Sequence, residues 1–163
     1  MSTLKVGTIQ DPTNSNTAIS VDSSGRVFKP QTPFISLLRN VDANYAANTV
    51  LNGFRVSDSR GITYNDTTGV MTVPVAGLYM IYLCGIIDTS AGIFLQVQGT
   101  TISRIIYNQE TTASDWDSSA GQHIHQLNAN DEVRFVAANG TLHMYGSTTA
   151  SGTVGGAGMY LIG

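Results

Sequence analysis

The sequence predicts an all-β protein built as an antiparallel sandwich or jelly roll. Charged residues make up only 12% of the 163 residues, 42% are hydrophobic, and 17 are glycine. From Phe34 onward, short apolar runs recur about every ten residues with turn-forming residues between them, the pattern of many short strands. No window has helical periodicity. The apolar content excludes disorder, and the low Ala/Glu/Lys/Leu/Arg content excludes a coiled coil.

Each apolar run predicts one strand. We expect strands at residues 34–39, 49–56, 70–74, 77–87, 92–98, 101–107, 122–128, 132–138, 141–146 and 157–162. Asn139-Gly140, between two of these runs, is the strongest hairpin signal because both residues tolerate positive φ.

The run at 77–83 is apolar on both faces. Alternate residues of a strand point to opposite faces. One face takes Leu78, Met80 and Tyr82, and the other takes Tyr79, Ile81 and Leu83. A strand of this kind is expected to be covered on both sides.

Residues 1–33 differ in composition from residues 34–163, so we predict an N-terminal arm followed by a knob. The arm has few large apolar side chains, and residues 17–28 read as one small hairpin around Asp22-Ser-Ser-Gly25. One hairpin cannot form a core, so the arm is expected to pack on its own body, on a second copy or on a partner; a disordered tail is the alternative. The candidate docking residues are Leu4, Val6, Ile9, Ile19, Val21, Val27 and Phe28.

Charge excludes several partners. The formal net charge is −3, with 8 basic and 11 acidic residues, and there is no basic stripe for nucleic acid or for an anionic membrane. The longest apolar run is roughly half of a membrane span, and no secretory signal opens the chain, so we expect synthesis in a cytoplasm. Cys84 is expected to be a buried small hydrophobe, because no second cysteine is present to form a disulfide.

Residues 61–79, which read GITYNDTTGVMTVPVAGLY, resemble the signature of the globular heads of complement recognition proteins, a jelly-roll family similar to tumour necrosis factor. Residues 127–133 and 158–161 resemble two further marks of that family in the right order. Met71 and Asn130 replace the usual aromatic and glycine. The resemblance implies a jelly roll that forms a homotrimer about a threefold axis. Interface candidates, each of which could equally be core, are Tyr79, Tyr82, Tyr107 and Tyr160.

Residues 4–17 and 22–27 of the arm carry a second resemblance. They are similar to the opening of structural proteins in marine tailed bacteriophages, notably cyanophages. The resemblance implies a short β-rich anchor that precedes a fibre or a knob.

His123 and His125 are candidate metal ligands. Residues two apart on a strand share a face, so three chains about an axis would offer six imidazoles to a transition metal. Leu127 lies on the same face, and the matching leucine of the family points into the sandwich. The competing interpretation is therefore a pair of ordinary hydrogen-bonded histidines, unless a bulge reverses the face.

Asp115, Trp116 and Asp117 are candidate ligand contacts in a polar run. An aromatic ring flanked by acids can stack on a sugar and accept its hydroxyls, although a loop tryptophan also serves as a lid over a core. Nothing in this run predicts the facing carboxyls of a glycosidase. Nucleophile-elbow and zinc motifs are also missing from the sequence.

The first hypothesis is a non-enzymatic structural protein of a tailed-phage virion, made in the host cytoplasm. Its trimeric knob would be a head decoration, head fibre or tail-fibre element, attached to other virion proteins by the arm. We expect no cofactor, apart from the possible axial metal. The alternative is an adhesin whose 110–121 and 146–156 loops bind a host-surface glycan, and the third hypothesis is a polysaccharide hydrolase.

Overall fold

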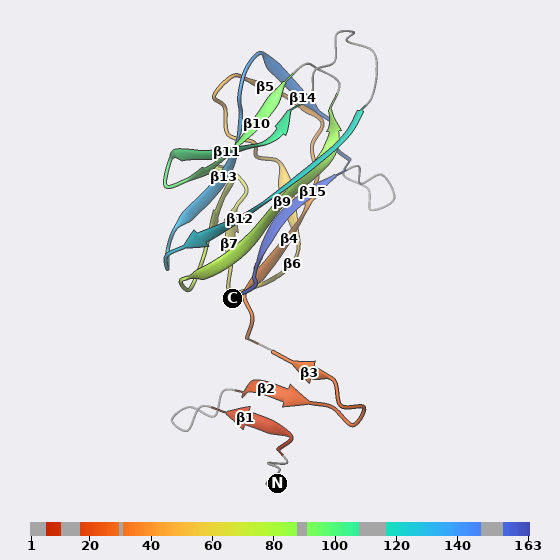
Figure 1. The fold of residues 1–163 in the computed structure, drawn as a ribbon. Coiled ribbons are helices and arrows are strands. Elements are labelled where there is room, and N and C mark those ends of the chain that lie inside the picture. Colours follow the sequence, from red (N-terminus) through yellow and green to blue (C-terminus); the bar gives the residue numbers. More distant parts are fainter. Residues whose placement is uncertain (1–5, 11–16, 30, 88–90, 108–116, 148–154) are drawn as a thin grey trace. The chain divides into compact units, whose positions relative to one another are not determined.

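The computed structural model describes residues 6–10, 17–29, 31–87, 91–107, 117–147 and 155–163. Contacts divide the chain into two units, Met1–Thr32 and Pro33–Gly163, called the arm and the knob below. Every regular element in these described ranges is a β-strand, and all the pairings are antiparallel (Figure 1). The predicted all-β class is confirmed.

The arm forms a small antiparallel sheet, called the arm sheet. The predicted hairpin is present as β2 (Thr17–Val21) and β3 (Val27–Phe28). A strand that we did not predict, β1 (Thr8–Gln10), pairs with the other edge of β2.

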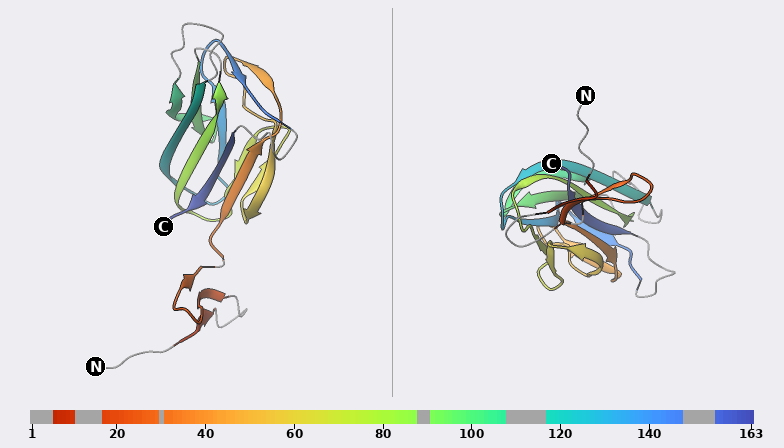
Figure 2. Two further views of the ribbon diagram at one scale, coloured as in Figure 1. Left: turned by 90° about the vertical axis from the view of Figure 1, so that its right-hand side faces the viewer. Right: turned by 90° about the horizontal axis from the view of Figure 1, so that it is seen from below.

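The knob is a sandwich of a large sheet and a small sheet (Figures 1 and 2). The large sheet runs in the order β5 (Ala43–Ala46), β14 (Thr141–Met144), β9 (Gly77–Ile87), β15 (Gly156–Leu161), β4 (Phe34–Arg39) and β6 (Phe54–Arg60). A seventh strand, β12 (Asp117–Leu127), pairs with β9 along its whole length. The small sheet runs in the order β11 (Thr100–Tyr107), β10 (Gly92–Val97), β13 (Glu132–Ala137), β8 (Val70–Thr72) and β7 (Thr63–Asn65).

The core lies between the two sheets and is made of aliphatic and aromatic side chains. Ile81 and Leu83 enter it from β9, and Leu95 and Val133 from the small sheet, all with no exposed surface. Burial of each such side chain stabilises the fold by about 1.5–3 kcal/mol. Among the described residues, Arg39 is the one charged side chain that is fully buried.

The predicted strand at 49–56 was wrong. The strand is β6, Phe54–Arg60, and upstream of it Val50 makes only an isolated bridge to Val136. Gly53 separates the two with a φ of 74°, a left-handed conformation that interrupts an extended strand. The short strands β5 and β7 were not predicted, because their sequences, ANYA and TYN, contain no apolar run.

Candidate functional site

The outward face of the large sheet is the candidate functional site. Along β9, core residues alternate with Leu78, Met80, Tyr82, Cys84 and Ile86, which remain at least partly exposed on the opposite face. The alternation follows from the period of two residues in a strand. The predicted division of residues 78–83 into two faces is therefore observed, and one of these faces has no cover within the described part of a single chain.

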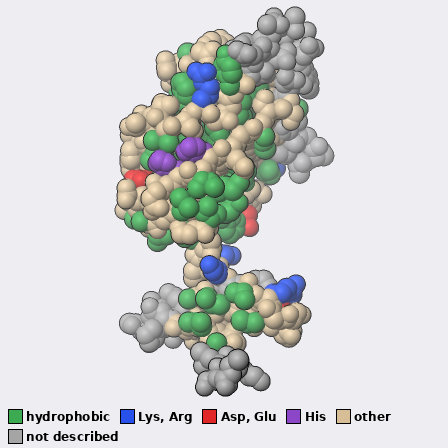
Figure 3. Space-filling model, in the orientation of Figure 1, with side chains coloured by type: hydrophobic (Ala, Val, Ile, Leu, Met, Phe, Trp, Pro, Cys, Tyr) green, Lys and Arg blue, Asp and Glu red, His purple; other side chains and the backbone are tan. Residues whose placement is uncertain are grey.

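The register of the neighbouring strands extends this surface. Met80 lies between Ile124 of β12 and Tyr160 of β15, and Tyr160 in turn pairs with Phe34 of β4. Leu78, Ile124 and Tyr160 are 37%, 53% and 39% exposed. We define the outer apolar face as Phe34, Leu38, Leu78, Met80, Tyr82, Ile86, Ile124 and Tyr160. Figure 3 shows hydrophobic side chains gathered over this part of the knob, and exposed apolar patches are typical of interaction surfaces.

Two tyrosines of this face lie against neighbouring strands. The Tyr160 hydroxyl donates to the Met80 sulfur at 2.8 Å. The Tyr82 ring lies across Gly158, because a methyl group added there would be 2.8 Å from the Tyr82 hydroxyl. Glycine at 158 therefore lets the aromatic ring lie flat against β15.

A hollow of about 300 Å³ indents the same face between β9 and β12. It is lined by Tyr82, Leu83, Cys84, Ala120, Gly121 and Gln122. Cys84 and Ala120, which pair with each other, are the small side chains of the hollow on this face. Gly121 is small for a different reason: a methyl group there would point inward and lie 1.8 Å from the Ile105 carbonyl oxygen of β11. Ile124 and three of the residues that line the hollow belong to the same strand, β12. The face therefore has both a raised part and a recessed part.

The four interface tyrosines separate into three groups. Tyr82 and Tyr160 lie on the outer apolar face. Tyr79 points into the sandwich, is fully buried, and donates its hydroxyl to the Val75 carbonyl at 2.9 Å. It is a core residue, which corrects its place among the interface candidates. Burial raises the pKa of Tyr79, so its hydroxyl stays protonated. Tyr107 belongs to β11 of the small sheet, where the Arg104 guanidinium lies 4.7 Å from its ring centre.

His123 and His125 lie on the inward-facing side of β12. Their partners across the ladder are Ile81 and Tyr79, which are both core residues, and the two imidazole rings are 5.8 Å apart. No group of three or more His, Cys, Asp or Glu side chains comes together within the described residues. His143, on β14, instead contacts Asp42 at 2.6 Å through Nε2.

The predicted ligand loop lies mostly outside the described residues. Asp115 and Trp116 fall there, and the backbone of Asp117 begins β12.

The sequence did not predict a second depression, of about 530 Å³, on the small sheet. It is lined by Thr63, Tyr64, Asn65, Thr68, Val70, Thr72, Glu132 and Arg134. Strands β7, β8 and β13 bring these residues together from distant parts of the sequence, so no local motif could have revealed it.

In the arm, most of the candidate docking residues are exposed. Ile9, Val21 and Val27 are 50%, 38% and 63% exposed, and Val6 is also exposed. Ile19 is partly exposed, whereas Leu4 and the Phe28 side chain lie outside the described structure.

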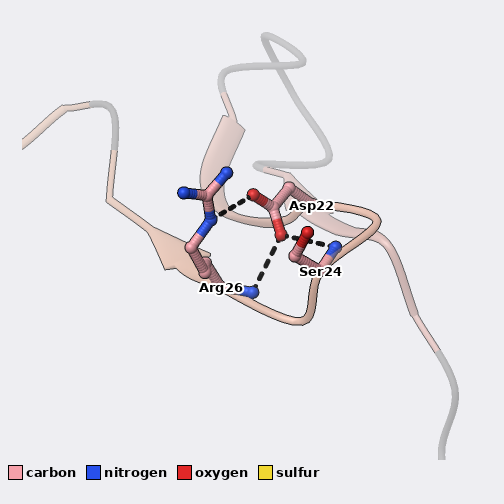
Figure 4. A network of polar contacts seen from close by, with 3 residues as sticks. All are labelled: Asp22, Ser24 and Arg26. Carbon is pink, nitrogen blue, oxygen red and sulfur yellow. Dashed lines mark hydrogen bonds and ion pairs between the residues drawn. The ribbon is translucent and has the colours of Figure 1, made fainter.

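The hairpin turn that joins β2 to β3 is held by its own residues (Figure 4). One Asp22 carboxylate oxygen accepts from the backbone N–H groups of Ser24 and Arg26, both at 2.9 Å, and the other accepts from Arg26 Nε at 2.7 Å. These contacts, led by the Arg26 backbone N–H, lower the pKa of Asp22. Gly25 supplies the left-handed position of the turn, with a φ of 78°.

Comparison with solved structures gives the fold of the knob. An Eiger TNF from S. frugiperda matches with a TM-score of 0.65 and 12% identity, over 82% of this chain and 94% of that one. The globular domain of zebrafish complement 1qA matches with a TM-score of 0.60 and 17% identity, over 81% and 98%. Murine APRIL matches with a TM-score of 0.58 and 16% identity, over 80% and 99%.

The knob is a jelly roll of this type. The fold expected from residues 61–79 is thereby confirmed, although the low identities carry no activity from those proteins to this chain. No protein-family model matches the sequence, and no curated protein matches it. The described residues contain no helix long and apolar enough to cross a membrane.

Proposed function

We propose that this protein is a non-enzymatic structural protein of a tailed-phage virion, a homotrimeric jelly-roll knob attached by its N-terminal arm. The observation that carries the proposal is the outer apolar face. Obligate interfaces resemble a protein core, and this face presents isoleucine, leucine, methionine and tyrosine on adjacent strands. Three copies about one axis would bury it, as the sequence resemblance to complement heads implies.

The arm supports the second half of the proposal. It is a separate unit of Met1–Thr32, and its small sheet leaves most of its described apolar side chains exposed. Its sequence resembles the anchors of marine phage structural proteins. A small sheet with an uncovered apolar face gains stability when it packs on another chain, whether a second copy or a protein of the particle.

Sedimentation equilibrium of the full chain tests the trimer. We expect three times the chain mass of 17.3 kDa. Ile124→Asn should shift the equilibrium toward monomer by about a hundredfold, because three copies each lose about 1 kcal/mol of burial. Val75→Asn is the matched control, since Val75 is 43% exposed but lies outside the strands of the face. A monomeric full chain at micromolar concentration would overturn the proposed trimer.

Particle incorporation tests the location. Mass spectrometry of purified particles of the phage that encodes the chain should detect it as a stoichiometric component. A chain without residues 1–32 should be absent from particles assembled in its presence. Incorporation without the arm would contradict attachment through it.

An adhesin is the second candidate, favoured by the depression on the small sheet. The Arg134 guanidinium donates to Gln96 at 3.1 Å, and Glu132 pairs with Thr72, so charged and hydroxyl groups are presented together. Such groups can bond sugar hydroxyls. A glycan array probed with the full chain should show binding that is lost in Glu132→Gln if the depression is used, and in Trp116→Ala if the 110–121 loop is used. No binding by the unaltered chain weakens the adhesin.

A further inference from the structure

One face of the arm sheet carries four branched aliphatic side chains. Ile9 pairs with Ile19 and Val21 pairs with Val27, and Ile19 and Val21 are two residues apart on β2. Since residues two apart share a face, the four side chains lie together. The opposite face carries Thr8 and Ser20, which pair with each other, and Phe28 pairs with Ser20 from β3. We call the first four residues the arm face.

The arm face carries no charge that would keep copies of it apart. The described charged residues of the arm are Asp22, Arg26 and Lys29. Asp22 and Arg26 neutralise each other in the turn through the 2.7 Å contact. Only branched aliphatic side chains remain on the arm face, and identical faces of this kind can pack on one another without repulsion or loss of a hydrogen bond.

The chain brings copies of the arm together if the knob is a trimer. Phe34, the second residue of the knob, belongs to the outer apolar face, where it pairs with Tyr160. Only Pro33 therefore separates the proposed interface from Thr32, the last residue of the arm. Three arms would start beside one another, and linked segments of this length have effective concentrations in the millimolar range.

We propose that the three arms of a trimer pack on one another through the arm face, with Ile9, Ile19, Val21 and Val27 directed toward the threefold axis. The inference rests on the proposed trimer. It assigns these four candidate docking residues to contacts between copies, and leaves the edges of the arm sheet to contact the particle.

Disulfide trapping in the full chain tests the proposal. Cys84→Ala removes the natural thiol, and Val21→Cys then places one thiol on the arm face. Thiols that face a common axis can approach to the distance of about 4 Å between Cβ atoms that a disulfide requires. Ser20→Cys, one residue away on the opposite face, is the matched control. Ile9→Cys places a thiol on β1 in case Val21→Cys prevents the arm from folding.

We expect mild oxidation to give covalent dimers with Val21→Cys or Ile9→Cys, at least about tenfold more than with Ser20→Cys. At most two chains of each trimer can be linked, so one third of the chains should stay single. A trimer by sedimentation that gives no more dimer with the arm-face cysteines than with Ser20→Cys overturns the inference and leaves the proposed function intact. A monomer by sedimentation overturns both. Cross-links from Val21→Cys to another virion protein, in purified particles, would assign the arm face to the particle instead.

Discussion

The Arg39 guanidinium carbon lies 5.2 Å from the centre of the Tyr45 ring, inside the sandwich and away from water. The Phe54 ring lies at the same distance, and the guanidinium donates to the carbonyls of Asn52 and Met144. No described carboxylate pairs with Arg39. A buried cation is held here by aromatic faces and backbone oxygens.

Arg39→Ala should lower the free energy of unfolding by about 3–5 kcal/mol, because it leaves a cavity and unpaired carbonyls. Arg60→Ala is the control: Arg60 lies 5.3 Å from the Phe34 ring but is exposed, and we expect a loss of about 0.5–1 kcal/mol. Urea unfolding at one protein concentration measures both. Equal losses would contradict the buried role of Arg39.

Gly158→Ala should weaken both folding and self-association. A methyl group at this position would lie 2.2 Å from the Ile35 carbonyl oxygen as well as against Tyr82. We expect a loss of about 1–3 kcal/mol in urea unfolding and a shift toward monomer in sedimentation, as Tyr82 is displaced from the sheet. Gly163→Ala is the control, since nothing lies within 4 Å of a methyl group there. An unchanged trimer in Gly158→Ala would remove Tyr82 from the interface.

Acid should loosen the arm turn through protonation of Asp22. The pKa of Asp22 is lower in the folded turn than in an unfolded chain. Its stabilising contribution is therefore complete above the unfolded value, near pH 4, and disappears as the pH falls through the folded value. An NMR titration of the carboxyl carbon should give a midpoint below the ordinary range, and Asp22→Asn should abolish the pH dependence of the Ser24 and Arg26 amide shifts. A normal midpoint would mean that the turn does not persist in solution.

The trimer should bind no stoichiometric metal through His123 and His125. Both imidazoles share the inward face of β12 with Leu127, and the described residues offer them no third ligand. Elemental analysis after incubation with Zn²⁺ or Fe²⁺ should give the same metal content for the unaltered chain and for the His123→Ala/His125→Ala double variant. Metal that is lost in this variant, but kept in His143→Ala, would restore the axial site.

The sequence predicted the strands well where the apolar pattern within a strand was sufficient to define its bounds. The bounds of β4 and β9 agree with the expected 34–39 and 77–87, because their apolar residues alternate without interruption. β12 begins five residues earlier than the expected start at 122, since Ser118 to Gly121 have no apolar pattern and are strand only because the long edge of β9 pairs with them. Pairing with a strand distant in the sequence decided that boundary, and the residues at 117–121 do not show which strand will pair with them.

The sequence predicted that the candidate site exists but not which residues form it. Two apolar faces on β9 showed that something must cover one of them. The alternation put Tyr79 and Tyr82 on opposite faces, but which face points outward depends on where the small sheet lies, so the sequence did not show that Tyr79 is the buried one. Tyr107 could not be excluded from the outer apolar face either, because only the strand order assigns it to the small sheet.

The pairing of β4 with β15 joins the first strand of the knob to the last one, Phe34 to Tyr160 at one end. During synthesis, β4 leaves the ribosome long before its partner exists, so the large sheet cannot close until β15 has been made. The arm sheet pairs only neighbouring residues and can form early. Nascent chains would thus carry a finished arm and an open knob, and an unpaired β4 edge is the stage at which aggregation competes with maturation.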